Sequence, residues 1–120
     1  MERYIYNGKI LSAYDCDTLT ILFDLGFNIS IEQNCRLYGV DAPELRTRNI
    51  MEKKLAIKGR DFVRELVVDK ELLIKSHGTG KYGRILIEIF LEDGITLNNL
   101  LIEKNLVRPY FGGKREKWFS

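Results

Sequence analysis

The stretch over residues 36–44 reads Arg36-Leu-Tyr-Gly-Val-Asp-Ala-Pro-Glu44, and it marks the end of a β-like run. Pro43 fixes the backbone after the run, because its ring locks one dihedral angle and restricts the residue before it. The same nine residues hold one guanidinium and two carboxylates. An arginine binds phosphate oxygens in pairs, whereas a carboxylate binds a hard cation or transfers a proton. The stretch therefore indicates both a boundary in the fold and a phosphate-and-metal site.

Apolar periodicity on both sides of this stretch predicts the order of the elements. Three β-like runs come first, over residues 4–14, 18–23 and 29–40, with a turn at residues 26–28. Helical spacing follows over residues 49–67, and Gly59 is the position at which the apolar stripe has no side chain. The stripe expected to face the core consists of Met51, Leu55, Phe62 and Leu66.

The second half of the chain predicts two more strands and a short helix. The strands, over residues 71–76 and 85–91, are joined by a glycine-rich loop over residues 77–83. Thr96 is expected to cap a helix over residues 97–104, and Asn105 is expected to end it. The residues of this helix expected to face inward are Leu97, Leu100 and Leu101.

Five strands with a helix between the third and the fourth is the element order of an oligonucleotide/oligosaccharide-binding (OB) barrel. We therefore predict an α+β, mainly β fold. It is a five-stranded Greek-key OB-fold barrel with an inserted helix between strands three and four and a short C-terminal helix. The length of 120 residues and the hydrophobic content of 45% suit a single domain over residues 1–120.

Composition limits the functional classes only weakly. The 19 basic and 17 acidic residues leave a net charge of +2, which is too small to predict a nucleic-acid partner by itself. Basic residues do gather over residues 46–64 and 108–117, which slightly favours a polyanion. No run resembles a leader or a membrane span, so we expect a cytoplasmic protein. Cys16 and Cys35 are too few for a disulfide framework and are expected to be reduced thiols.

Asp15 and Asp17 flank Cys16 at the junction of the first two β-like runs. Asp17 shares its strand parity with Leu19, so an inward-facing row places Asp17 at the rim of the barrel. The alternative is that both aspartates are turn residues that bond the local backbone.

The central stretch offers similar alternatives. Asp41 and Glu44 can complete a carboxylate site, or they can cap a turn and begin the approach to the helix. Arg36 and Asp41 have opposite strand parity, so a bulge or twist near Gly39 is needed to bring them to one site. Arg84 follows the glycine loop, where the common alternative is an arginine on an exposed strand edge.

Three motifs in this order resemble those of the staphylococcal nuclease (thermonuclease) family. The family patterns Asp-Gly-Asp-Thr, Arg-Leu-x-Gly-Ile/Val-Asp-x-Pro-Glu and Lys-Tyr-Gly-Arg correspond to residues 15–18, 36–44 and 81–84. The resemblance runs over about residues 4–110. It implies a calcium-dependent phosphodiesterase that cuts DNA or RNA with little sequence preference and leaves 3′-phosphate ends. We also expect a monomer that prefers single-stranded or loosened nucleic acid.

The resemblance also implies a role for each matching residue. The residues that match the calcium ligands are Asp17, Asp41 and the backbone carbonyl of Ala42, with Asp15 in a supporting position. Glu44 matches the carboxylate that acts on the attacking water, as a general base or as a positioning group. The residues that match the phosphate-gripping arginines are Arg36 and Arg84. Those that match the nucleotide-binding residues are Lys81, Tyr82 and Tyr110.

Two features depart from the family pattern. Cys16 stands where the family has glycine, and a position that needs a positive φ would be strained by roughly 1–2 kcal/mol. The chain is also short after Tyr110, so Trp118 and Phe119 are expected to pack in place of the family's final helix. A rival hypothesis is a module of the same fold that binds nucleic acid or protein without cutting, and a third is a structural subunit that docks through residues 110–120. The presence of both ligand aspartates, both arginines and the glutamate favours the enzyme.

Overall fold

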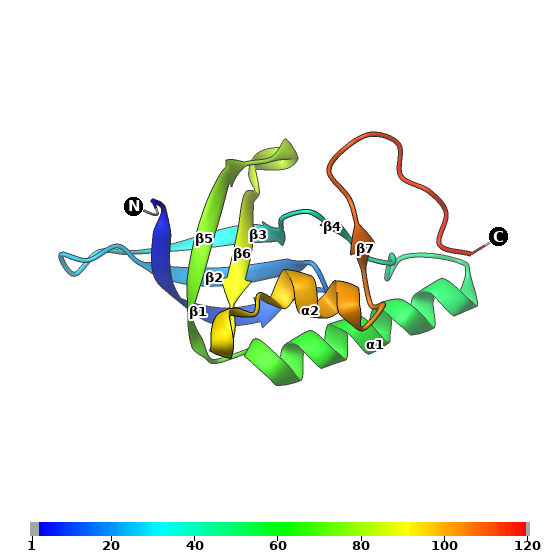
Figure 1. The fold of residues 1–120 in the computed structure, drawn as a ribbon, viewed down its shortest axis with the longest axis horizontal. Helices are drawn as coiled ribbons and strands as arrows, with labels where there is room; N and C mark the ends of the chain where they lie inside the picture. Colours follow the sequence, from blue (N-terminus) through cyan, green and yellow to red (C-terminus); the bar gives the residue numbers. More distant parts are fainter. Residues whose placement is uncertain (1–2, 120) are drawn as a thin grey trace.

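The computed structural model describes residues 3–119, and its centre is a closed five-stranded β-barrel (Figure 1). The barrel strands are β1 (Ile5–Ala13), β2 (Thr18–Asp24), β3 (Ser30–Leu37), β5 (Glu71–Thr79) and β6 (Ile85–Phe90). Their order around the barrel is β1-β2-β3-β6-β5, and β1 closes it by pairing with both β2 and β5. Only β3 and β6 run parallel among these neighbours.

Two helices cover one side of the barrel. Helix α1 (Ile50–Val67) lies between β3 and β5 in the chain, and α2 (Leu97–Glu103) follows β6 (Figure 1). The structure therefore has the predicted α+β OB-fold with its inserted helix. None of the helices within residues 3–119 is long and apolar enough to cross a membrane.

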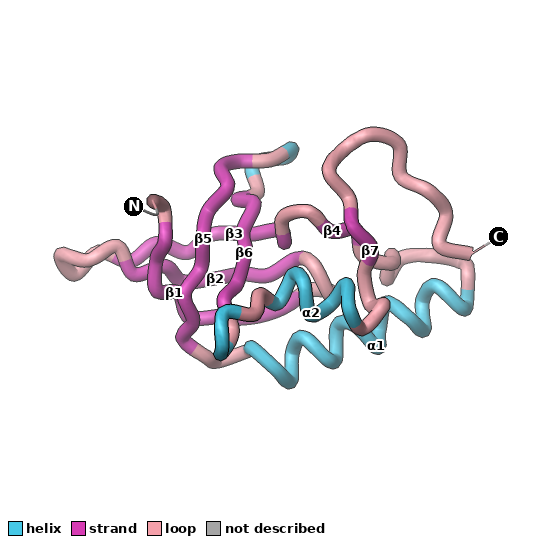
Figure 2. The backbone as a smooth tube through the Cα atoms, viewed as in Figure 1, coloured by secondary structure: helices cyan, strands magenta, loops and turns pink. Residues whose placement is uncertain are grey.

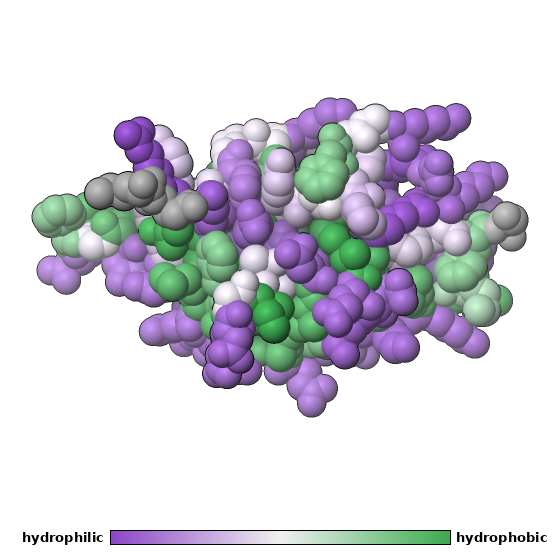
Figure 3. All heavy atoms as spheres, in the orientation of Figure 1, coloured by the Kyte–Doolittle hydropathy of each residue, from purple (hydrophilic) through white to green (hydrophobic). Residues whose placement is uncertain are grey.

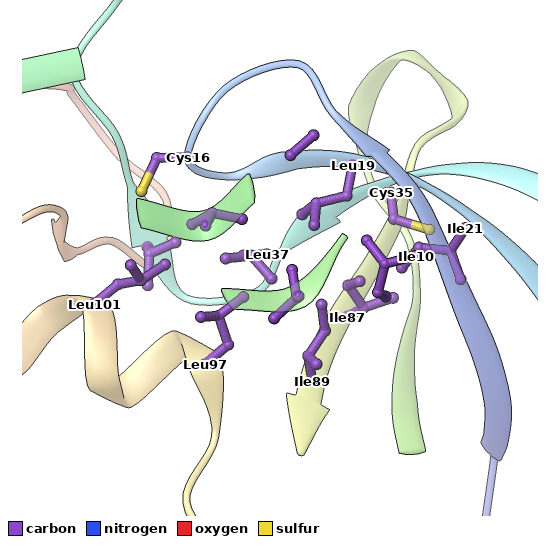
Figure 4. Close-up of a cluster of buried hydrophobic side chains, with 14 of the residues drawn as sticks. Ile10, Cys16, Leu19, Ile21, Cys35, Leu37, Ile87, Ile89, Leu97 and Leu101 are labelled. Carbon is purple, nitrogen blue, oxygen red and sulfur yellow. The ribbon is translucent and has the colours of Figure 1, made fainter. Parts of the chain in front are cut away.

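The interior of the barrel follows the alternation predicted for its strands. Along β2, Leu19, Ile21 and Phe23 are buried, whereas Leu22 and Asp24 between and after them are exposed. Figure 4 shows Leu19 and Ile21 among apolar side chains from β1, β3, β6 and α2. Because Asp17 continues this inward row by two residues, it is buried at the rim, as its parity predicts.

The third predicted strand, residues 29–40, is divided in two. Strand β3 ends at Leu37, a turn follows at Tyr38 and Gly39, and β4 (Val40–Asp41) then pairs with the short strand β7 (Arg108–Pro109). Gly39 has φ +78°, a left-handed conformation that favours glycine. This turn is the change of direction near Gly39 that the opposite parities of Arg36 and Asp41 require.

Three of the four residues in the predicted core stripe of α1, Leu55, Phe62 and Leu66, pack against the core, whereas Met51 does not, and the fully buried line lies beside them. The buried residues of the helix are Ala56, Gly59, Val63 and Val67, whereas Leu55, Phe62 and Leu66 flank this line and Met51 is 57% exposed. Ala56 and Gly59 have little or no side chain, so at these residues the helix backbone can lie close to the barrel, where α1 contacts β1 and Gly59 faces Cys16. Gly59 is therefore the point of tightest packing. Asn49 caps the helix by accepting a hydrogen bond from the backbone N–H of Glu52 at 3.0 Å.

Helix α2 begins and ends close to the predicted residues. The Thr96 hydroxyl accepts a hydrogen bond from the backbone N–H of Asn99 at 3.1 Å, and Asn105 ends the helix with φ +58°. Leu97 and Leu101 face the core as predicted, but Leu100 is only half-buried. Asn98 takes the remaining inward position, where it binds the backbone of Tyr38, Ile87 and Ile89.

The two ends of the glycine-rich segment differ from the prediction. Strand β5 continues to Thr79 with an irregularity after Ser76, and the loop shortens to a single 3₁₀ turn at Lys81–Gly83. Beyond β7 the chain forms a long arc that returns toward the beginning of α1 (Figure 2). We call residues 110–119 the tail, and none of them is in a helix or strand.

Candidate active site

The first half of the site lies where β2 begins and β3 ends, because Thr18 and Arg36 are paired across these strands. The Nη2 atom of Arg36 lies 3.7 Å from Oδ2 of Asp17 and donates a hydrogen bond to the carbonyl of Val40 at 3.0 Å. The hydroxyl of Thr18 donates to Oδ1 of Asp17 at 3.3 Å and accepts from Nη1 of Arg84 at 3.4 Å. One threonine thus connects the predicted carboxylate to the second predicted arginine.

Asp17 carries a charge that its surroundings do not fully compensate. Its side chain is buried, and its backbone N–H donates to Oδ1 of Asp15 at 3.1 Å. Burial, followed by the negative charge of Asp15, raises the pKa of Asp17 to about 7, although Arg36 acts in the opposite direction. The charge of Asp41 also raises this pKa, so the two predicted ligand aspartates influence each other.

The second half of the site is centred on Asp41, which is 1% exposed at the end of β4. Strand β7 places Arg108 opposite it, with Nη2 at 3.3 Å and Nε at 3.4 Å from Oδ2. The Nη2 atom of Arg115 approaches Oδ1 to 2.6 Å. This contact is an ion pair without hydrogen-bond direction, and within residues 3–119 the buried Oδ1 accepts no hydrogen bond. Ala42, whose carbonyl is a predicted ligand, is buried beside Asp41.

Glu44 lies at the open edge of the site, and its side chain is 53% exposed. Its backbone N–H donates to Oε2 of Glu52 at 2.8 Å, which ties the residue to the first turn of α1. Its Oε1 lies 3.1 Å from Nη1 of Arg115. Partial burial lowers the pKa of Arg115, but the charges of Asp41 and Glu44 more than offset this and raise it. Arg115 therefore bridges the two carboxylates as a full cation.

A cleft of about 560 Å³ adjoins these residues, and its wall holds three arginines, Arg36, Arg84 and Arg115, together with one lysine and several aromatic rings. The predicted site residues that line it are Arg36, Arg84, Lys81, Tyr82 and Tyr110. Arg36 lies with its guanidinium carbon 6.0 Å from the ring centre of Tyr110, and the ring of Tyr82 is 93% exposed. Cationic and aromatic groups in one open cleft fit a phosphodiester chain with its bases.

The carboxylates do not form a ready-made metal cage. Within residues 3–119, no three side chains of His, Cys, Asp or Glu are grouped closely enough to hold a metal ion. The donor chemistry still fits calcium, which binds carboxylate and carbonyl oxygens together with water. Asp41 provides a buried oxygen whose contact is the Arg115 guanidinium, and burial followed by the negative charges of Asp15 and Asp41 raises the pKa of Asp17.

Cys16 does not strain the site. It has no positive φ, unlike the seven other non-glycine residues that do within the described chain. Its thiol is buried against the backbone of Gly59, and burial together with the charges of Asp17 and Asp15 raises its pKa above the ordinary range. Cys16 and Cys35 are both free and buried, and Figure 4 shows them at separate ends of the core cluster.

Arg108 and Arg115 are the site residues that the sequence did not reveal, because both appeared only as members of a basic tail. One signal was available. Asp15, Asp17, Asp41 and Glu44 carry more negative charge than the two predicted arginines neutralise, so further cations were required nearby. Figure 3 shows hydrophilic side chains gathered over the tail, in contrast to the apolar tip of the β2–β3 hairpin.

The comparisons with known proteins agree with this geometry. A family model described as staphylococcal nuclease homologue matches residues 34–117, which is well over half of the chain. No curated protein matches the chain. The matched residues include Arg36, Asp41, Glu44 and Arg84, whereas Asp17 lies before them and is connected to them through Arg36.

Proposed function

Because the chain belongs to the staphylococcal nuclease homologue family, we propose that it is a calcium-dependent nuclease. It hydrolyses phosphodiester bonds of DNA or RNA and leaves 3′-phosphate ends. The observation that supports this best is the contact chain from Asp17 through Arg36 and Thr18 to Arg84 at the edge of a cationic, aromatic cleft. A phosphate bound in that cleft would contact the guanidiniums of Arg36 and Arg84. Asp17 lies next to Arg36 and is connected to Arg84 through Thr18.

The two arginines stabilise the negative charge that builds on the phosphate as it becomes five-coordinate. They extend from the end of β3 and the residue before β6, so both are held by the barrel. Arg36 is further fixed by the carbonyl of Val40, and Arg84 by the hydroxyl of Thr18. Donors fixed before the reaction stabilise the transition state more than the ground state, and removing one typically lowers the rate by roughly 10²–10³.

Glu44 is the residue proposed to act on water. Its carboxylate is half-exposed, so water reaches it, and its backbone is anchored to α1 through Glu52. As a general base, Glu44 takes a proton while the water oxygen forms a bond to phosphorus. The bond from phosphorus to the 5′ oxygen breaks, and the displaced oxygen leaves with a proton from solvent.

Asp17, Asp41 and the carbonyl of Ala42 are the groups proposed to hold calcium, with Asp15 supporting Asp17. When bound, the ion supplies positive charge to the phosphate oxygens and a Lewis acid for the reaction. Without it, the chain's own residues hold the phosphate and orient the water. Asp41 also keeps Arg108 in place at 3.3 Å, which links the site to β7.

Lys81, Tyr82 and Tyr110 are proposed to hold the nucleotide chain on either side of the phosphate. Their open position suits bases that are unstacked, so single-stranded or loosened nucleic acid is the expected substrate. A net charge of +2 gives little long-range attraction. Binding should therefore be modest and salt-sensitive, and we propose that the protein acts as a monomer.

The test is the release of acid-soluble nucleotides from denatured DNA, with calcium and with a chelator. We expect release only with calcium, and Arg84→Ala should lower it by about 10²–10³. Arg60→Ala is the matched control, because that guanidinium pairs with Asp61 on α1, outside the cleft, and its removal should leave the rate unchanged.

The rival function is binding without cleavage. The ion pairs of Arg115 with Asp41 and Glu44 favour it to the extent that they occupy the groups needed for hydrolysis. Binding of a labelled single strand that Arg84→Ala weakens, without calcium-dependent release by the wild-type protein, would refute the enzyme and support the binding module.

A further inference from the structure

The tail is held against the site by one residue of β7. Arg108 donates to the backbone carbonyls of Glu116 and Lys117, and its guanidinium lies 4.2 Å from the ring centre of Trp118. The same guanidinium binds Asp41. Arg108 thus connects the far end of the tail to the buried carboxylate, and this fixes where the residues between them must pass.

The tail is otherwise loosely attached. Residues 111–117 are all exposed, and a hollow of about 490 Å³ lies between residues 115–119 and the start of α1, where it reaches Asn49 and Glu52. At the near end, the N–H of Tyr110 donates to the carbonyl of Gly39. Between its two ends the tail is held by the Phe111 ring, which meets Tyr38 edge-on with 5.8 Å between the ring centres, and by the ion pairs of Arg115. Few contacts must therefore break for this segment to move away from the barrel.

Arg115 is the point at which the tail enters the site. Its two terminal nitrogens are used on Asp41 and Glu44, at 2.6 and 3.1 Å. These are a carboxylate proposed to bind calcium and the carboxylate proposed to act on water. A guanidinium between them supplies the positive charge that a divalent cation would supply, and the repulsion between two cations at these distances makes them compete for the same carboxylates.

We infer that the tail is a displaceable strap, which closes the candidate site of the free protein by holding Arg115 between Asp41 and Glu44. A divalent cation that binds these carboxylates displaces Arg115. The strap then separates from the site, and Trp118 leaves its contact with Arg108. This inference rests on the proposed function, because it takes Asp41 as a calcium ligand. Arg115 is a poor candidate for a third phosphate-binding residue in this arrangement, since both of its terminal nitrogens already face carboxylates.

The experiment measures calcium binding without nucleic acid, by titration calorimetry, for the wild-type protein, Arg115→Gln and Lys114→Gln. Removing the competing guanidinium should tighten calcium binding roughly three- to tenfold, because the Arg115 side chain is half-exposed and water screens its ion pairs. Lys114→Gln loses the same charge from the next residue of the tail and should bind calcium within about twofold of the wild-type protein.

The fluorescence emission of Trp118 gives a second measurement, which reports movement of the tail and not a change in charge alone. It is the only tryptophan of the chain, and it lies on Arg108. Calcium should change the tryptophan emission of the wild-type protein with the same midpoint as the calorimetric titration. In Arg115→Gln the emission should be shifted before calcium is added.

Each other outcome overturns a defined part of the inference. Equal calcium affinity in all three proteins, with unchanged Trp118 emission, refutes the strap and leaves the proposed function standing. Tighter binding by Arg115→Gln with unchanged emission refutes the displacement, because it reflects charge alone. If neither the wild-type protein nor Arg115→Gln binds calcium, the metal assignment of the proposed function fails, and the strap fails with it.

Discussion

Replacing Gly59 with alanine should destabilise the protein and, through Cys16, disturb the candidate site. A Cβ at residue 59 would lie 3.0 Å from the Sγ of Cys16 and 3.2 Å from its Cβ, which is closer than ordinary contact. Cys16 is 1% exposed and belongs to the core cluster, so a shift of its side chain would press on other buried residues. It stands between Asp15 and Asp17, so any shift of its backbone also moves these carboxylates.

Two effects of opposite sign determine the magnitude. Alanine stabilises a helix over glycine by about 1 kcal/mol, whereas overpacking a core costs about 1–3 kcal/mol. Because the new methyl group would meet two atoms of an immobile residue, we expect a net loss of about 1–2 kcal/mol in the free energy of unfolding. Cys16→Gly removes both opposing atoms. In that background Gly59→Ala should be neutral or stabilise by up to about 1 kcal/mol, so the two changes should couple by about 2 kcal/mol.

The assay is urea unfolding of the wild-type protein, both single variants and the double variant. Lys58→Ala, at the exposed neighbouring position of α1, is the control for helix propensity alone. If the two substitutions are additive within about 0.5 kcal/mol, the contact between Cys16 and Gly59 does not limit the packing at this position. Calcium-dependent nuclease activity should follow the same pattern, falling in Gly59→Ala and recovering in the double variant.

Three further predictions concern the carboxylates and the buried amide. The folded pKa of Asp17 lies above its unfolded value of 3.8, so the native state keeps a proton that the unfolded state releases. In a chelator, stability should therefore fall as pH rises from about 4 to about 7, by on the order of 2–4 kcal/mol, and urea unfolding of Asp17→Asn should lack this loss. Asn98→Ala removes three hydrogen bonds to the backbone, although the Ile87 carbonyl still accepts from the N–H of Tyr38, and it should lower the free energy of unfolding by about 2–4 kcal/mol. An unchanged urea midpoint would mean that water replaces the amide. Asp41→Asn should abolish the rise in melting temperature on addition of calcium; a rise equal to that of the wild-type protein would place the ion elsewhere.

The sequence predicted the barrel and half of the site because those features depend on local periodicity. Alternation along β2 is a two-residue pattern, so it located Leu19 in the core and Asp17 at the rim. The opposite parities of Arg36 and Asp41 likewise required a change of direction near Gly39, which the structure supplies as a turn.

The remaining features depend on contacts that local patterns do not encode. The predicted face of α1 did include Leu55, Phe62 and Leu66, which pack against the core, but it missed the fully buried line beside them. A stripe of large apolar residues is easier to recognise than a line that contains Ala56 and Gly59, although Gly59 permits the closest approach. Arg115 was missed because its partners, Asp41 and Glu44, are more than 70 residues away in the chain. Charge balance indicates that such a partner is needed, but only the path of the tail shows which arginine it is.

The parallel pairing of β3 with β6 has a consequence for the order in which the protein is made. It joins Cys35 to Ile85 and Arg36 to Leu86, so it cannot form until most of the chain has been synthesised. Arg36 and Arg84 meet at this pairing, and closing a loop of about 50 residues is slow compared with forming a hairpin. Growing chains and partly folded intermediates therefore hold the two phosphate-binding arginines apart. A protein with the activity proposed for this one would acquire the ability to cut nucleic acid only at a late stage of folding, after β6 has been synthesised and has paired with β3.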